Sequence, residues 1–119
     1  MDKEQRAEEF AADLSAIYLA LSIVLFRLPI PIQLPTAPEY LGECGEALSR
    51  ALALILDEPI TEDLQIELVH CCIDWLVADD LLSHFVLMGE KWRAAVITRN
   101  IACAKRDLLE ATRKLSAEE

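Results

Sequence analysis

The residues closest to a reactive arrangement in this sequence are Glu67, His70 and Asp74. In a helix, their spacing of three and four residues places all three side chains on one face. Carboxylate and imidazole groups on a shared face can hold a divalent metal ion when the fold supplies one more ligand. A solvent-facing stripe on an otherwise apolar helix has the same composition. We expect the solvent stripe and no metal, because His84 lies about 21 Å further along a continuous helix, too far to share an ion.

The four cysteines, Cys44, Cys71, Cys72 and Cys103, are the candidate nucleophiles and redox groups. All lie in apolar helical patterns, none belongs to a CxxC motif, and the adjacent pair cannot form an ordinary disulfide within a helix. No cation lies near the adjacent pair in sequence to stabilise a thiolate, and nothing around the cysteines favours pairing with His84 as a general base. The sequence therefore predicts buried reduced thiols, no cofactor and no enzymatic activity.

Basic residues gather in the last part of the chain. Residues 90–119 carry seven Lys or Arg against five Asp or Glu, a net +2, whereas residues 1–89 carry −12 and the whole chain −10. The overall negative charge repels nucleic acid and anionic membranes. Apart from Trp92, no aromatic residues interleave with these cations, and no helix-turn-helix spacing is present. We expect the basic face to pair with acidic residues of this chain or of a partner, without direct nucleic-acid binding.

The length and residue composition of the chain indicate what kind of fold would position these groups. A chain of 119 residues is long enough for one domain, residues 1–119, with a single core. Hydrophobic residues make up 54% of the chain and only three residues are glycine, which favours helices almost throughout.

The stretch Phe10–Leu28 carries apolar residues on two sides of a helix predicted over residues 3–28. A surface helix of a monomer needs one apolar stripe, so one side is expected to face the chain's own core and the other a second chain. The first side, the core seam, has heptad spacing and consists of Phe10, Leu14, Ile17, Leu21, Val24 and Leu28. The nearly opposite side, the outer seam, consists of Leu19, Ile23 and Phe26 with Ala12 and Ala16 beside them.

A membrane span and a secretory signal are not expected. The uncharged run is shorter than the ~18–20 residues that a bilayer core requires, and Arg27 and Pro29 close it. The chain opens with acidic residues and has no cleavage-type sequence behind them. These features predict a cytoplasmic protein.

Residues 29–38 are a proline-rich connector with four prolines in ten residues. Proline excludes a helix here and biases the preceding residues toward extended geometry. The connector can then span up to about 30 Å and carry the chain along the length of a bundle. Ile30, Ile32 and Leu34 alternate along it, so one edge is expected to lie on the core.

Capping signals set the boundaries of the other helices. Thr36 with Glu39 predicts a capping box, Thr61 can cap the third helix, and Gly89 is a suitable end for that helix. The third helix either continues through residues 79–80 or is split there. The predicted fold is an all-α, four-helix bundle with helices over about residues 3–28, 37–56, 61–88 and 90–115.

The surplus of apolar surface predicts a non-enzymatic interaction protein, homodimeric through the outer seam. Each large apolar side chain that becomes fully buried contributes about 1.5–3 kcal/mol, and left exposed it would form a patch typical of interaction sites. An alternative is a bundle that binds an apolar small molecule between its helices, although few polar groups are available to orient one. The predicted protein interface consists of Tyr18, Leu19, Ile23, Leu25 and Phe26.

The layout of the chain resembles the small bacterial anti-activators that bind and disable quorum-sensing transcription regulators of the LuxR type. The resemblance rests on a short acidic chain with an apolar first helix, Phe10–Leu28, a connector, Pro29–Pro38, and a basic last helix, Lys91–Lys114. It covers the whole chain in layout but includes no fingerprint motif, so no binding residue can be carried over. It implies that the protein binds a transcription regulator, occupies its dimerisation surface and prevents it from binding DNA.

Overall fold

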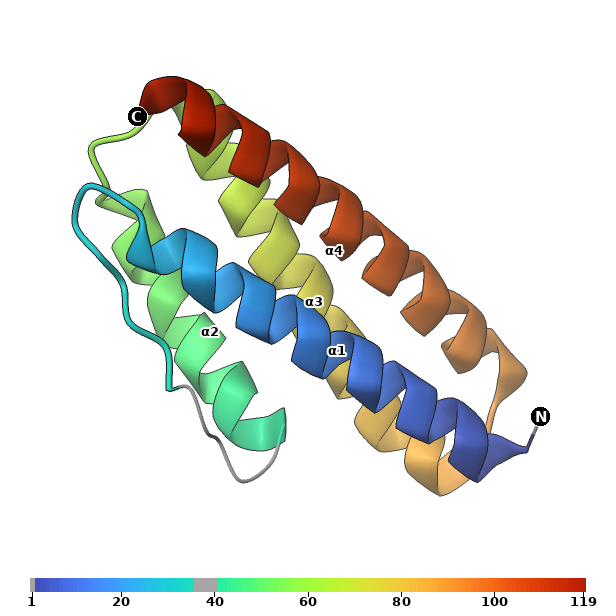
Figure 1. The fold of residues 1–119 in the computed structure, drawn as a ribbon. Helices are drawn as coiled ribbons and strands as arrows, with labels where there is room; N and C mark the ends of the chain where they lie inside the picture. The colour runs from blue at the N-terminus through green and yellow to red at the C-terminus, as the bar shows by residue number, and fades with distance from the viewer. Residues whose placement is uncertain (1, 36–40) are drawn as a thin grey trace.

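The computed structural model describes residues 2–35 and 41–119, and within them it contains four helices and no strand. The helices are α1 (Lys3–Phe26), α2 (Leu41–Leu56), α3 (Glu62–Met88) and α4 (Lys91–Glu118). Helices α1, α2 and α4 run in one direction and α3 runs in the other (Figure 1). This confirms the predicted all-α, four-helix bundle.

Local capping explains where α1 and α3 begin and where α3 ends. The Asp2 carboxylate accepts a hydrogen bond from the backbone N–H of Gln5 at 2.8 Å, and the Gln5 side chain accepts from the Asp2 N–H. Thr61 caps α3 by accepting from the Leu64 N–H at 3.3 Å, as predicted. Gly89 ends α3 with a φ of +66°, a left-handed conformation that glycine adopts without steric cost.

The ends of α1 and α4 differ from the predicted ones by two and three residues. α1 ends two residues earlier than predicted, because the residue before Pro29 disfavours helical geometry. α3 is one unbroken helix through residues 79–80, which excludes the split alternative. α4 continues to Glu118, since no helix-breaking residue follows Leu115. The predicted capping box of Thr36 and Glu39 lies outside the described residues.

The core is formed by one apolar stripe from each helix, and α3 and α4 form the most extensive pair. All six members of the core seam of α1 are buried, which confirms that prediction. The largest fully buried side chain is that of Trp75, at the centre of α3. The other helices contribute buried residues that include Cys44, Leu48, Ala51 and Ile55 from α2, Leu64, Leu68, Cys71 and Leu82 from α3, and Ile97, Ile101, Ala104, Ala111 and Leu115 from α4.

Two hydrogen bonds to backbone carbonyls fix how α1 is turned about its own axis. The Trp75 indole N–H donates to the carbonyl oxygen of Leu14 at 2.7 Å, inside the core. The Tyr18 hydroxyl, whose ring lies beside Trp75, donates to the carbonyl oxygen of Pro35 at 2.7 Å. With both bonds in place, the core seam faces the bundle and the outer seam faces away from it.

Polar contacts hold α1 parallel to α4 and in constant register. The Arg6 side chain donates to Thr98 at 3.4 Å, and the Arg27 guanidinium donates to the Glu119 carboxylate at 2.6 Å, each pair 92 residues apart in the chain. Lys105 lies 3.5 Å from Asp13 between them, and Lys114 bonds Glu67 of α3 at 3.1 Å. The predicted pairing of basic α4 residues with the acidic part of the chain is therefore confirmed for Lys105 and Lys114.

The described part of the connector, residues 29–35, runs back along α1 (Figure 1). Ile32 and Leu34 are buried, and the Ile32 N–H donates to the Leu25 carbonyl at 3.0 Å. Ile30 is exposed, so only two of the three residues predicted to line the core do so. The Ile30 N–H is instead bonded to the buried carboxylate of Glu58 at 3.0 Å.

We predict that Trp75→Phe lowers the free energy of unfolding by about 1–3 kcal/mol, because it removes a buried hydrogen bond and leaves a small cavity. Urea denaturation followed by circular dichroism measures this change. The matched control is Trp92→Phe at a half-exposed position on α4, which should change the free energy by about 0.5 kcal/mol or less. Equal effects of the two variants would contradict the role assigned to the Trp75 indole.

Candidate protein-interaction surface

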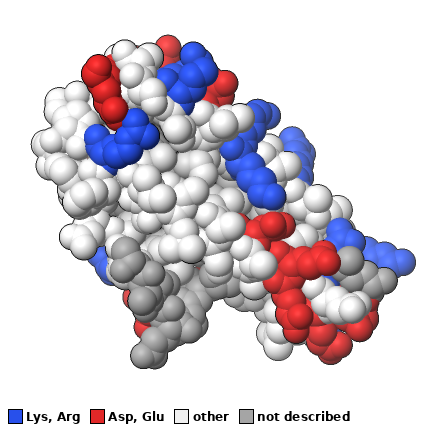
Figure 2. Space-filling view, viewed as in Figure 1, with Lys and Arg blue, Asp and Glu red and all other residues white. Residues whose placement is uncertain are grey.

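The outer seam of α1 is exposed along its whole length. Its three large side chains are half to two-thirds exposed: Leu19 50%, Ile23 65% and Phe26 57%. Ala12 and Ala16 are exposed on the same face. Figure 2 shows a broad uncharged area over the C-terminal half of α1, with acidic side chains gathered at its N-terminal end and basic ones on the side of α4. Large apolar side chains exposed together without charges are typical of interaction surfaces.

Two of the five residues predicted for the interface, Tyr18 and Leu25, are buried, and that part of the prediction is wrong. Tyr18 is 1% exposed and Leu25 is 0% exposed. The physical reason is that the connector folds back along this flank of α1. The carbonyl oxygen of Pro35 in the connector accepts a hydrogen bond from the Tyr18 hydroxyl. Both side chains therefore belong to the core.

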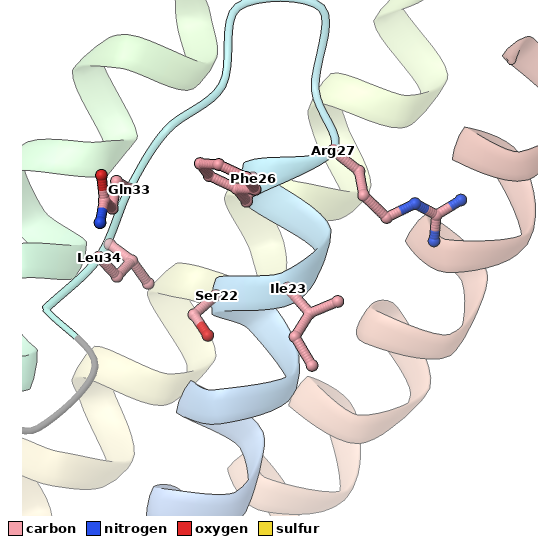
Figure 3. A pocket seen from close by; sticks show the side chains of 6 residues that line it. All are labelled: Ser22, Ile23, Phe26, Arg27, Gln33 and Leu34. Atoms are coloured by element: carbon pink, nitrogen blue, oxygen red, sulfur yellow. The ribbon is translucent and has the colours of Figure 1, made fainter.

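A groove of about 360 Å³ lies between the C-terminal half of α1 and the connector. Phe26 points toward the connector, whereas Ile23 and Arg27 point toward the side of α4 (Figure 3). The sequence did not predict the connector's share of this groove, because Gln33 and Leu34 lie close to α1 only through the return path of the chain. The groove is lined by Ser22, Ile23, Phe26, Arg27, Gln33 and Leu34.

Other exposed apolar side chains are distributed over the remaining helices. On α3, Ile66 and Ile73 are exposed. Trp92 and Leu109 of α4 are exposed as well, at 53% and 72%. These positions lie outside the groove beside α1.

The three candidate metal ligands, for which the sequence predicted no metal, lie on α3 in different surroundings. Glu67 is bonded to Lys114, and His70 is exposed. Among residues 2–35 and 41–119, no three His, Cys, Asp or Glu side chains lie together in a way that could hold a metal ion.

The thiols of Cys71 and Cys72 are poor nucleophiles in this fold. Cys44, Cys71 and Cys72 are buried free thiols, as predicted, and Cys103 is partly buried. Burial raises the pKa of Cys72 to about 12, and it also raises the pKa of Cys71, with a further contribution from the neighbouring Cys72. Their reactive thiolate forms are therefore disfavoured at neutral pH.

A hydrogen-bonded carboxyl pair joins Asp74 of α3 to Asp107 of α4. Burial raises the pKa of Asp74 to about 6, and the hydrogen bond to Asp107 and its negative charge act in the same direction. His70 and Arg106 oppose this shift. Two carboxylates cannot hydrogen-bond each other unless one holds a proton, so this contact favours a protonated Asp74.

The length and composition of α1 also meet the requirements of a membrane-spanning helix. An 18-residue window reaches a mean hydropathy of 1.7, with 39% of the window buried inside the bundle. The prediction that this segment is too short to span a bilayer is therefore wrong. It counted only the uncharged run, whereas the 24-residue helix Lys3–Phe26 includes further apolar and alanine positions on the N-terminal side.

The comparisons with known proteins identify no relative. No protein-family model matches the chain, and no curated protein or solved structure is significantly similar to it.

We predict that Asp74→Asn stabilises the protein more at pH 7.5 than at pH 5. Because the pKa of Asp74 is higher in the folded state, its protonated form stabilises the fold. This contribution is fully present below pH 3.8, the ordinary pKa of an aspartate, and is lost as the pH rises through about 6. Asparagine cannot ionise and so does not lose this stability, which is measured as the difference in Tm between variant and wild type at each pH.

The exposed position Asp57 provides the matched control, since Asp57→Asn should shift Tm equally at both pH values. Burial and the charge of Asp80 also raise the pKa of Asp79 to about 6, so Asp79→Asn should resemble Asp74→Asn. If the Tm difference between Asp74→Asn and wild type did not depend on pH, the raised pKa of Asp74 would be contradicted.

Proposed function

We propose that this protein is a non-enzymatic, homodimeric regulatory protein that binds another protein through the outer seam of α1. The observation that carries the proposal is the exposure of Leu19, Ile23 and Phe26 along a helix face without charged side chains. Covering each of them contributes up to about 1.5–3 kcal/mol, depending on how much surface leaves water. The groove beside Phe26 adds a concave site for an apolar side chain of the partner.

The proposed partner is a transcription regulator, and the proposed consequence is its sequestration in the cytoplasm. This class is drawn from the resemblance in layout to anti-activators of LuxR-type quorum-sensing regulators. An apolar helix face fits a partner that presents an apolar groove or face, and the resemblance implies that this is the regulator's dimerisation surface. By occupying that surface, the protein would keep the regulator from pairing and from binding DNA. The net charge of −10 disfavours direct contact with DNA by this protein.

Binding of an apolar small molecule is a second candidate, which the groove of about 360 Å³ favours. This volume falls within the usual range of about 300–1,000 Å³ for ligand sites. Arg27, Gln33 and Ser22 are the polar residues among its lining. Solvent extraction of the purified protein followed by mass spectrometry separates the two functions, because only a ligand-binding protein would release a stoichiometric apolar compound.

We predict that Ile23→Lys leaves the protein folded but removes binding of the regulator. The side chain is 65% exposed, so lysine can extend into solvent in the free protein, whereas in a complex it would bury an unpaired charge. Circular dichroism checks the fold, and affinity capture from the native host with mass spectrometry checks the partner. A captured regulator should then lose DNA binding in a gel-shift assay when the wild-type protein is added.

Two further lysine variants serve as controls for Ile23→Lys. Ile73→Lys places the same change on an exposed position of α3 and should retain the partner, whereas Leu21→Lys in the core should unfold the protein. Unfolding of Ile23→Lys, or retention of the regulator by it, would contradict the proposed binding surface.

A further inference from the structure

We propose that the cavity between the N-terminal ends of α1 and α4 binds the phosphate group of a small organic phosphate monoester. The cavity has a volume of about 390 Å³, within the usual range of about 300–1,000 Å³ for ligand sites. It lies at the end of the bundle where α1 and α4 both begin, beside the turn that ends α3 (Figure 1). None of the described residues that line it belongs to the outer seam, so the site is independent of the proposed function.

Three cationic side chains line this cavity without forming an ion pair to any described residue. Lys3 and Arg6 come from the start of α1, and Lys91 is the first residue of α4. Of the eleven Lys and Arg in the chain, six form ion pairs among the described residues, and three of the other five are these. The lining contains one acidic side chain, that of Asp2, and therefore carries +2 in a molecule of net charge −10. Such a local excess of positive charge attracts an anion.

Contacts with the rest of the protein hold two of these cations in position. A Cβ atom added at Gly89 would lie 3.0 Å from Cδ of Lys3, so the Lys3 side chain packs on the turn between α3 and α4. The Arg6 guanidinium donates to the Thr98 hydroxyl at 3.4 Å and lies over the Phe10 ring, 5.4 Å from its centroid. Neither contact supplies a negative charge. Both cations are therefore positioned in advance and still available to a ligand.

The beginning of α4 adds to the positive charge of the cavity. Its first turn contains no acidic residue, and no side chain caps its N-terminus. The Glu90 carboxylate, which precedes the helix, is bonded instead to the indole N–H of Trp92 and to the guanidinium of Arg93. The first N–H groups of α4 thus keep their partial positive charge, which reinforces the charge of Lys91.

The charge and the composition of the lining favour a phosphate monoester over a carboxylate. A phosphate monoester carries about −1.5 to −2 charges at pH 7 and three strong acceptor oxygens, which matches three cations and a lining of +2. A carboxylate has one charge and two oxygens and would leave part of the positive charge unbalanced. Phe85 and Ala94 also line the cavity and provide apolar surface for the organic part of the ligand.

Titration of the intact ¹⁵N-labelled protein with phenyl phosphate, followed by NMR, tests this site. We expect saturable shifts of the Gly89 and Lys91 amide signals. Benzoate has the same ring with a single charge, and inorganic phosphate has a similar charge without the ring, so both should bind more weakly. Lys3→Gln and Lys91→Gln should each weaken the binding of phenyl phosphate about tenfold, because each removes one charge-assisted hydrogen bond. Both positions are exposed, and circular dichroism checks that the variants fold.

Two control variants separate a defined site from general attraction between charges. Arg50→Gln removes one positive charge from an exposed position on α2, which contributes no residue to the lining, and should leave the affinity unchanged. Ala95→Leu keeps every charge but adds a larger side chain at an exposed position of the lining. It should weaken binding, because the added side chain occupies part of the cavity.

Each of the contrary results would overturn a stated part of the inference. Absence of saturable shifts at about 10 mM phenyl phosphate, where a Kd of about 1 mM gives nearly full occupancy, would overturn the site. Equal affinity for benzoate would overturn the phosphate class, and equal affinity for inorganic phosphate would overturn the organic part. Equal losses in Arg50→Gln and Lys91→Gln would overturn the location. Ile23→Lys should bind phenyl phosphate as the wild type does, so failure of the proposed function is observed separately.

Discussion

The rotation of α1 about its own axis is the constraint on which the rest of the structure depends. The helix carries two apolar seams, and the bundle has room for one of them. The Trp75 indole, bonded to the Leu14 carbonyl within the core, selects the seam that faces inward. The Tyr18 hydroxyl, bonded to Pro35, holds the same rotation from the connector side. With these bonds in place, Leu19, Ile23 and Phe26 are exposed on the described surface.

The connector serves both the core and the surface. Its return along α1 is imposed by prolines, which prevent it from forming a helix, and by the parallel direction of α1 and α2, which requires the chain to travel the length of the bundle. On its inner edge it buries Ile32 and Leu34. On its outer edge it forms one wall of the groove beside Phe26. The ionic pairs between α1 and α4 meanwhile border the uncharged face and leave it free of unpaired charge.

Much of the architecture follows from sequence spacing, because period and capping are local properties of the chain. The core seam of α1, the Thr61 cap and the Gly89 terminus were all predicted from residue type and interval. The burial of Tyr18 and Leu25 was not, since it depends on which flank of α1 the connector covers, and no local pattern encodes that choice. The hydrogen bond between Asp74 and Asp107 was not predicted for a similar reason. The two residues come close only when α3 and α4 pack against each other.

The central claim is that the outer seam is open in a single chain and becomes covered by another polypeptide. The most direct measurement is methyl NMR with a soluble paramagnetic probe, recorded over a dilution series of the intact protein. The Ile23 methyl groups should be strongly relaxed in dilute samples and become protected as the concentration rises, while the buried Ile17 methyl groups stay protected throughout. Ile23 signals as protected as those of Ile17 at every dilution, or accessible at every concentration, would contradict the account.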